Sequence, residues 1–86
     1  MRVVVGDVLT VSGKKYICLS TRIEESKKYI FVCELTNDEE PTDKFKVFEL
    51  IDKGVKEVKE SDLLNKLLKY FSSSVNDMVK SLGGHA

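Results

Sequence analysis

Residues 15–35 read KYICLSTRIEESKKYIFVCEL, and this stretch decides the fold. Apolar and polar residues alternate on both sides of a polar break at 25–27, which is the pattern of two β-strands joined by a turn. One face of the second strand would carry Tyr29, Phe31, Cys33 and Leu35, and the other face Ile30 and Val32. The stretch therefore predicts an antiparallel hairpin at the centre of a sheet.

Turn residues recur every eight to ten positions through residues 1–60, which is typical of an antiparallel meander. The predicted strands are 3–11, 15–24, 28–36, 44–52 and 55–59. Gly6 and Asp7 are expected to bend the first strand. The connection 37–43 holds the only proline and is not expected to join a central strand. Five strands of this length fit an SH3-like barrel or a strongly bent sheet, which puts the chain in the α+β, mainly β, class.

The hydrophobic period changes to that of a helix after residue 60. Ser61 suits an N-cap, and Asp62 lies where the helix dipole favours an anion. The apolar stripe consists of Leu64, Leu68, Phe71, Val75, Met78 and Leu82, widened by Leu63, Leu67 and Val79. This pattern predicts one amphipathic helix over 61–82 that ends at Gly83 and Gly84. A kink at the three serines 72–74 is the alternative.

A helix over 61–82 would be about 33 Å long, whereas strands of this kind extend about 20 Å. Its last turns are therefore expected to extend past the sheet. The predicted anchor for a protein partner or a second copy is the stripe of Phe71, Val75, Met78, Val79 and Leu82. A longer sheet that covers this stripe is the alternative.

The two cysteines depend on the register of the central hairpin. A two-residue turn at 25–26 would place Cys18 opposite Cys33. A turn one residue longer would pair 17, 19 and 23 with 35, 33 and 29, a more apolar set that puts the thiols on opposite faces. We favour the longer turn. Buried structural thiols are expected in either case, because two cysteines without a histidine pair cannot supply four zinc ligands.

Nothing in the sequence predicts catalysis or a cofactor. The single histidine, His85, follows a double glycine near the end of the chain, where a side chain is poorly held. The acidic run that includes Asp38 and Asp43 lacks the glycine turn of a calcium loop, so a solvated loop is expected. There is no glycine-rich phosphate loop and no nucleophile motif. We expect a non-catalytic protein with no metal site.

Charge and hydropathy limit the partners. The 14 basic and 14 acidic side chains cancel, which disfavours a protein that works mainly by wrapping nucleic acid. The alternative is a basic surface of Lys14, Lys15, Arg22, Lys27 and Lys28, with Tyr16 and Tyr29 available for stacking. No apolar run is long enough for a membrane span or a signal peptide, so a cytoplasmic location is expected.

Three segments resemble a known kind of protein: GDVLTVSGKKYICL at 6–19, YIFVCEL at 29–35 and FKVFEL at 45–50. The first resembles the opening hairpin of SH3-like small barrels. The set is similar to short uncharacterised proteins of Firmicutes and their phages or mobile elements, over residues 6–70. The resemblance implies a small barrel and allows a role as inhibitor of a host nuclease or defence factor. It transfers no functional residue.

The sequence is thus interpreted as a single domain, with a meander over 1–60 and a helix over 61–82 packed on it. We expect a non-catalytic protein–protein interaction module that uses the C-terminal stripe as its apolar anchor.

Overall fold

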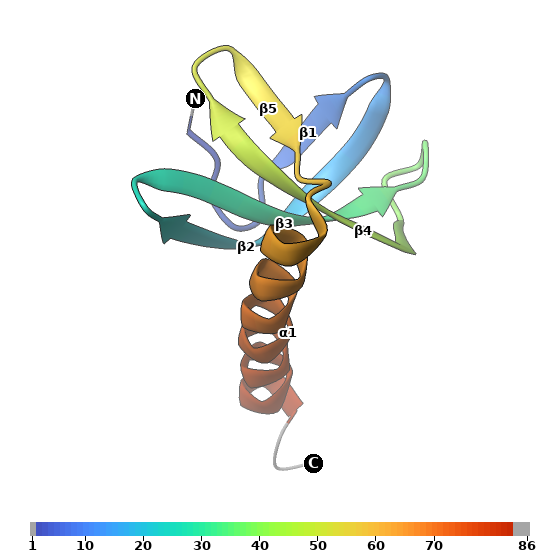
Figure 1. Cartoon of the computed structure of the whole chain (residues 1–86). Coiled ribbons are helices and arrows are strands. Elements are labelled where there is room, and N and C mark those ends of the chain that lie inside the picture. Colours follow the sequence, from blue (N-terminus) through green and yellow to red (C-terminus); the bar gives the residue numbers. More distant parts are fainter. Residues whose placement is uncertain (1, 84–86) are drawn as a thin grey trace.

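Each strand pairs with the strands that precede and follow it in the sequence. The computed structural model describes the backbone of residues 2–83 and the side chains of residues 2–72. The elements are β1 (Val8–Val11), β2 (Lys14–Glu24), β3 (Lys27–Leu35), β4 (Pro41–Ile51), β5 (Gly54–Glu57) and α1 (Ser61–Gly83). The sheet order is β1-β2-β3-β4-β5, with every neighbouring pair antiparallel (Figure 1). The predicted meander followed by one helix is confirmed.

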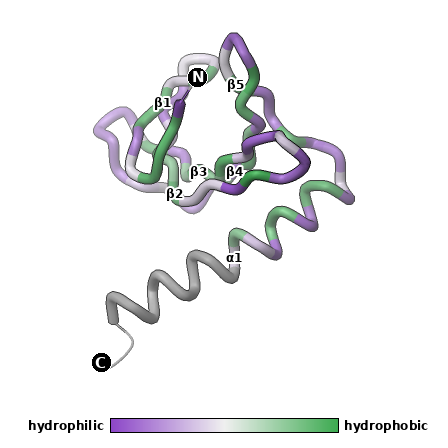
Figure 2. Tube along the Cα trace, turned by 90° about the vertical axis from the view of Figure 1, so that its left-hand side faces the viewer, coloured by the Kyte–Doolittle hydropathy of each residue, from purple (hydrophilic) through white to green (hydrophobic). Residues whose placement is uncertain are grey.

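The sheet curls into a half-barrel that does not close. β1 and β5 are the two ends of the strand order, and Figure 2 shows them on opposite sides of an opening, with α1 beneath the sheet. Of the two predicted shapes, the strongly bent sheet is therefore the one found. The sheet has an inner face, toward the hollow of the curl, and an outer face, toward α1.

The inner face carries a cluster that we call the inner core. Its members are Val3, Tyr16, Cys18, Ile30, Val32 and Phe48, all buried, with Leu9, Val11, Leu50 and Val55 packed against them. Side chains two apart along each strand share a face, so alternation accounts for nearly all of this cluster. Val3 joins from outside the sheet, and Lys28 Nζ donates a hydrogen bond of 2.9 Å to its carbonyl oxygen.

The segment before β1 is a turn, so the prediction of a strand starting at residue 3 is wrong. Asp7 N donates to Val4 O at 3.0 Å, and Gly6 has a φ of 96°, which an L side chain rarely adopts. Asp7 Oδ2 also accepts from Val4 N at 3.0 Å. This turn redirects the chain and brings Val3 into the inner core.

The outer face carries a second cluster, the outer core, which attaches α1. Its members are Tyr29, Val47, Val58, Leu67 and Phe71, with Phe31, Leu63 and Leu64 packed against them. The helix is continuous from Ser61 to Gly83, so the predicted helix over 61–82 is confirmed and the kink at 72–74 is absent. No helix in the described part of the chain is both long and apolar enough to cross a bilayer.

The β2–β3 turn differs from the one favoured by sequence. Glu24 pairs with Lys27, so the turn has two residues, and Glu25 and Ser26 have φ values of 49° and 68°. A bulge at Leu19 then shifts the register, so that Cys18 lies opposite Val32 and Ile17 opposite Cys33. The longer turn is therefore wrong. The expected placement of the two thiols on opposite faces is confirmed, and both are free and buried.

The strand β4 starts earlier than predicted, because Pro41 is its first residue. Proline is tolerated at the first position of a strand, where a missing N–H breaks no ladder bond. The preceding loop is closed by Thr36, whose N–H donates to Glu40 O at 2.8 Å and whose Oγ1 accepts from Glu40 N at 3.1 Å. The acidic connection is thus shorter than the predicted 37–43.

Candidate protein-interaction surface

Four apolar side chains lie side by side across the outer face. Val8 pairs with Ile17, Ile17 with Cys33, and Cys33 with Phe45, so the row crosses four neighbouring strands. We call these four residues the outer-face row. Directly paired residues in antiparallel strands point to the same side of the sheet. The two ends of the row are open to solvent, with Val8 47% and Phe45 52% exposed.

Phe45 is held in place by other aromatic rings. Its ring stacks on Phe31 with centroids 5.5 Å apart and an interplanar angle of 7°. Phe31 in turn stacks on Phe71 of α1 at 5.4 Å and 15°. Because Phe71 is 0% exposed, this column of rings connects a solvent-facing aromatic to the outer core. An exposed ring that is already ordered loses little conformational entropy when a partner covers it.

The helix is fixed beside this row by a charged and aromatic cluster. Arg22 Nη2 contacts Glu24 Oε1 at 2.6 Å, and the Arg22 guanidinium lies 3.8 Å above the centre of the Tyr70 ring. Lys66 of α1 approaches Glu24 Oε2 at 3.4 Å. Arg22, by hydrogen bond and charge, together with Lys66, lowers the pKa of Glu24. The cluster joins β2 to α1 and sets where the helix leaves the sheet.

An acidic loop flanks the Phe45 end of the row. Asp38 and Glu40 lie in the β3–β4 connection and Asp43 lies two residues before Phe45, and all three are exposed. No side-chain ion pair joins any of them to another described residue. Glu39 differs, because it pairs with Lys15 at 3.3 Å. With the exposed Lys44 beside Phe45 counted, this border of the row keeps a net negative charge, which favours a positively charged partner.

One residue of the predicted C-terminal anchor is not available for docking. Phe71 is fully buried against the chain's own sheet, so it is a core residue and not an exposed docking residue. The helix buries Leu67 and Phe71 with Leu63 and Leu64 beside them, whereas Leu68, which the predicted stripe placed on the buried side, is 36% exposed. The other members, Val75, Met78, Val79 and Leu82, lie outside the residues whose side chains are described, as His85 lies outside the described chain.

The predicted nucleic-acid surface is not assembled. Its five basic residues, Lys14, Lys15, Arg22, Lys27 and Lys28, divide between the two faces of the sheet. Lys14 and Lys15 pair with Glu34 and Glu39, Arg22 with Glu24, and Lys28 with a backbone carbonyl.

The tyrosines expected to stack bases are also inaccessible. Tyr16 lies in the inner core and Tyr29 in the outer core, each only 3% exposed. Tyr16 packs edge-on against Phe48 with ring centroids 5.4 Å apart. Stacking on bases needs an exposed ring face, so neither tyrosine can supply it in this fold.

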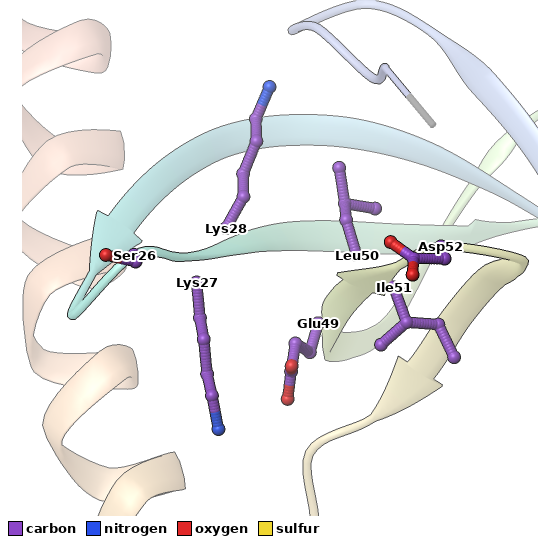
Figure 3. A pocket seen from close by; sticks show the side chains of 7 residues that line it. All are labelled: Ser26, Lys27, Lys28, Glu49, Leu50, Ile51 and Asp52. Atoms are coloured by element: carbon purple, nitrogen blue, oxygen red, sulfur yellow. The ribbon is translucent and has the colours of Figure 1, made fainter.

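A hollow of about 460 Å³ lies between the tips of the β2–β3 and β4–β5 hairpins (Figure 3). It is lined by Ser26, Lys27, Lys28, Glu49, Leu50, Ile51 and Asp52. Lys27 and Lys28 point to opposite sides of the strand (Figure 3), so they do not converge on one ligand. The lining mixes both signs of charge and holds no nucleophile with an adjacent base. This hollow supports no specific chemistry.

In the described part of the chain no three histidine, cysteine or acidic side chains gather as metal ligands. Burial raises the pKa of the Cys18 thiol, which donates to Ser20 O at 3.6 Å. Cys33 Sγ donates to Thr42 O at 3.1 Å. The Cys18 thiol is therefore a poor nucleophile, because the reactive form is the thiolate.

Comparison of the chain with protein families, with curated proteins and with solved structures finds no match. The outer-face row is therefore the most specific feature on which to base a function. Sequence reasoning did not single out Val8, Ile17 or Phe45. Alternation predicts Phe45 and Val47 on one face, and the structure agrees. Which of the two α1 covers depends on the packing angle of the helix, which the sequence does not give.

Proposed function

We propose that the chain is a non-catalytic, cytoplasmic protein–protein interaction module that docks a partner on the outer-face row, with Phe45 as the anchor. The observation that supports this most directly is the exposed Phe45 ring, stacked on Phe31 and through it on the buried Phe71. Aromatic side chains held in a defined position dominate the energy of many interfaces. Scattered exposed apolar residues are ordinary on protein surfaces, so the proposal rests on the ordered ring of Phe45 and not on the exposure of the row alone.

The partner is defined by the chemistry around the row. An apolar cavity or groove would receive Phe45, and basic side chains at its border would face Asp38, Glu40 and Asp43, which are exposed. Charge pairs at the rim of an interface mainly accelerate and orient association. The complex should therefore form more slowly at high salt, while its apolar contact is retained.

The nucleic-acid alternative has less support. Arg22 is engaged by Glu24 and Tyr70, and Tyr16 and Tyr29 are covered by the fold. Fluorescence anisotropy with labelled DNA and RNA at low and moderate salt tests this alternative directly. Salt-sensitive binding would favour it over protein docking. The C-terminal stripe Val75, Met78, Val79 and Leu82 stays a prediction for a second anchor.

The test uses photo-crosslinking in cells of the source organism. A benzophenone amino acid is placed at position 45 and, as the control, at position 23, because Ile23 is 71% exposed but stacks on no ring. The proposal expects one protein to be crosslinked at 45 and not at 23, and Asp43→Lys to reduce its yield. Equal labelling at both positions, or no protein adduct at 45, would contradict it.

A further inference from the structure

The edge strand β1 carries none of the charges or prolines that often protect a free sheet edge. It reads Val8-Leu9-Thr10-Val11, with no charge, proline or glycine, and its only neighbour in the sheet is β2. Native edges are normally blocked by charges, proline or bulges, because an open edge pairs with other strands. The opposite edge, β5, has such protection, since it carries Lys56 and Glu57.

The geometry of the first hairpin shows which backbone groups of β1 are open. Val11 pairs with Lys14 across a two-residue turn, with Ser12 and Gly13 at φ values of 52° and 79°. The pair that closes such a turn exchanges both of its hydrogen bonds, and bonding alternates along an antiparallel ladder. Val11 and Leu9 therefore bond to β2, and the N–H and C=O groups of Val8 and Thr10 point outward. No backbone group elsewhere in the described chain bonds to them.

We infer that β1 pairs antiparallel with β1 of a second copy, with Leu9 opposite Leu9 on the two-fold axis. In this register Val8 lies opposite Thr10 of the other chain, so outward groups meet outward groups. The four open groups of each strand then form four hydrogen bonds across the axis. Leu9 forms the non-hydrogen-bonded pair at the centre.

Other registers fit the strand less well. A shift of one residue would place outer-face side chains opposite inner-face ones, which the pleat does not allow. A shift of two would place Val8 opposite Ser12, which belongs to the turn and has a φ of 52°. The register centred on Leu9 is therefore the one that keeps both faces and uses all the open groups.

A second copy suits this edge for two reasons. The strand has no charge, so its two-fold pairing brings no like charges together. Leu9 is only partly buried where it packs against the inner core, and Leu9 of the other copy would cover it. Because the contact is only four residues long, we expect a weak, reversible dimer. This inference concerns the sheet edge and does not depend on the proposed partner of Phe45.

The experiment measures mass against concentration by sedimentation equilibrium for the full chain and two charge variants. Thr10→Lys adds a charge at the open edge, where Thr10 is exposed. Asn37→Lys adds the same charge in an exposed loop and serves as the control. The expected result is a concentration-dependent dimer, weakened at least tenfold by Thr10→Lys and unchanged by Asn37→Lys, with both variants folded by circular dichroism.

A crosslink then tests the register. Opposed residues of a non-hydrogen-bonded pair have Cα atoms about 4.5 Å apart, within the range of a disulfide. Under mild oxidation Leu9→Cys should give a covalent dimer, whereas Val11→Cys and the wild type, with its buried Cys18 and Cys33, should not. A monomer at every concentration would overturn the inference. So would a dimer that is insensitive to Thr10→Lys, because its interface would lie elsewhere.

Discussion

The ring of Phe31 in β3 stacks on the ring of Phe71 in α1, with centroids 5.4 Å apart and planes inclined by 15°. This contact joins the helix to the centre of the sheet and also supports Phe45, whose ring stacks on Phe31 as well. The stability of the fold and the position of the proposed anchor therefore depend on the same three rings.

Replacement of Phe71 should loosen the helix from the sheet. Phe71→Ala removes a fully buried ring, and large-to-small changes of this kind cost about 3–5 kcal/mol of unfolding free energy. Urea unfolding measures the loss. The matched control is Leu68→Ala, since Leu68 is 36% exposed in the same helix and should cost much less. Equal losses for the two variants would show that α1 does not pack through Phe71.

The β2–β3 turn should accept a stabilising change. Glu25 and Ser26 both have positive φ, which costs a side-chain-bearing residue free energy that Asn and Gly largely avoid. We expect the double variant Glu25→Asn, Ser26→Gly to raise the unfolding free energy by about 1 kcal/mol, after the entropy cost of glycine. The urea midpoint checks this. Asn37→Gly, at an exposed loop position whose φ is not positive, is the control and should not stabilise.

The carboxyl of Glu24 should titrate below its usual range. Its pKa is lowered by Arg22 first and also by Lys66. A lowered folded-state pKa means that the stabilising effect is complete above the ordinary glutamate pKa and is lost as pH falls through the lowered value. Carbon-13 NMR of the side-chain carboxyl measures the titration.

Arg22→Gln tests the cause of that shift. Without the guanidinium the pKa of Glu24 should rise toward the ordinary glutamate value, and the loss of stability at acid pH should begin at a higher pH. Lys66→Gln should move the pKa less, because Arg22 makes the closer contact, at 2.6 Å against 3.4 Å. The reverse order would assign the shift to the helix instead of to the neighbouring strand residue.

Neither thiol should react quickly in the native protein. Cys18 is 1% and Cys33 3% exposed, and burial raises the pKa of Cys18. We expect alkylation, followed by mass spectrometry, to be slow in buffer and fast in urea. Oxidation should form no intramolecular Cys18–Cys33 disulfide, because the side chains lie on opposite faces of the sheet. Rapid native labelling of Cys18 would contradict the buried inner core.

The strands and the helix follow from local pattern. Alternation in 15–35 and the helical spacing after residue 60 each identify a buried face, and burial of that face is what stabilises the element. The turn near residues 25–27 was located from the sequence, but its length could not be decided, because neither Glu25 nor Ser26 favours the positive φ that the two-residue turn requires. The predicted start of β4 is three residues too late, because Pro41 was expected to lie in the loop. Proline interrupts a ladder only at a position where a backbone N–H must donate, and the first position of β4 is not one of these.

The candidate surface needed the tertiary structure. Val8, Ile17 and Phe45 are far apart in the sequence and meet only through the register of four strands. That register depends on the bulge at Leu19, and neither Leu19 nor its neighbours is a residue type from which a bulge can be predicted. For Phe71 the sequence correctly predicted a place on the apolar face of the helix. It could not predict that the sheet beneath α1 buries this residue completely.

The extra residue in β2 has a consequence for natural chain-length variation. Leu19 interrupts the ladder between Cys18 and Ser20, which lie opposite the adjacent residues Val32 and Phe31. Omission of Leu19 would leave an ordinary alternating strand. All the remaining side chains of β2 would stay on the face of the sheet that they occupy now. A deletion in β2 outside Cys18–Ser20 would instead invert the side chains between the deletion and the bulge. Relatives of this protein that are one residue shorter in this region should therefore have lost their residue within the equivalent of 18–20.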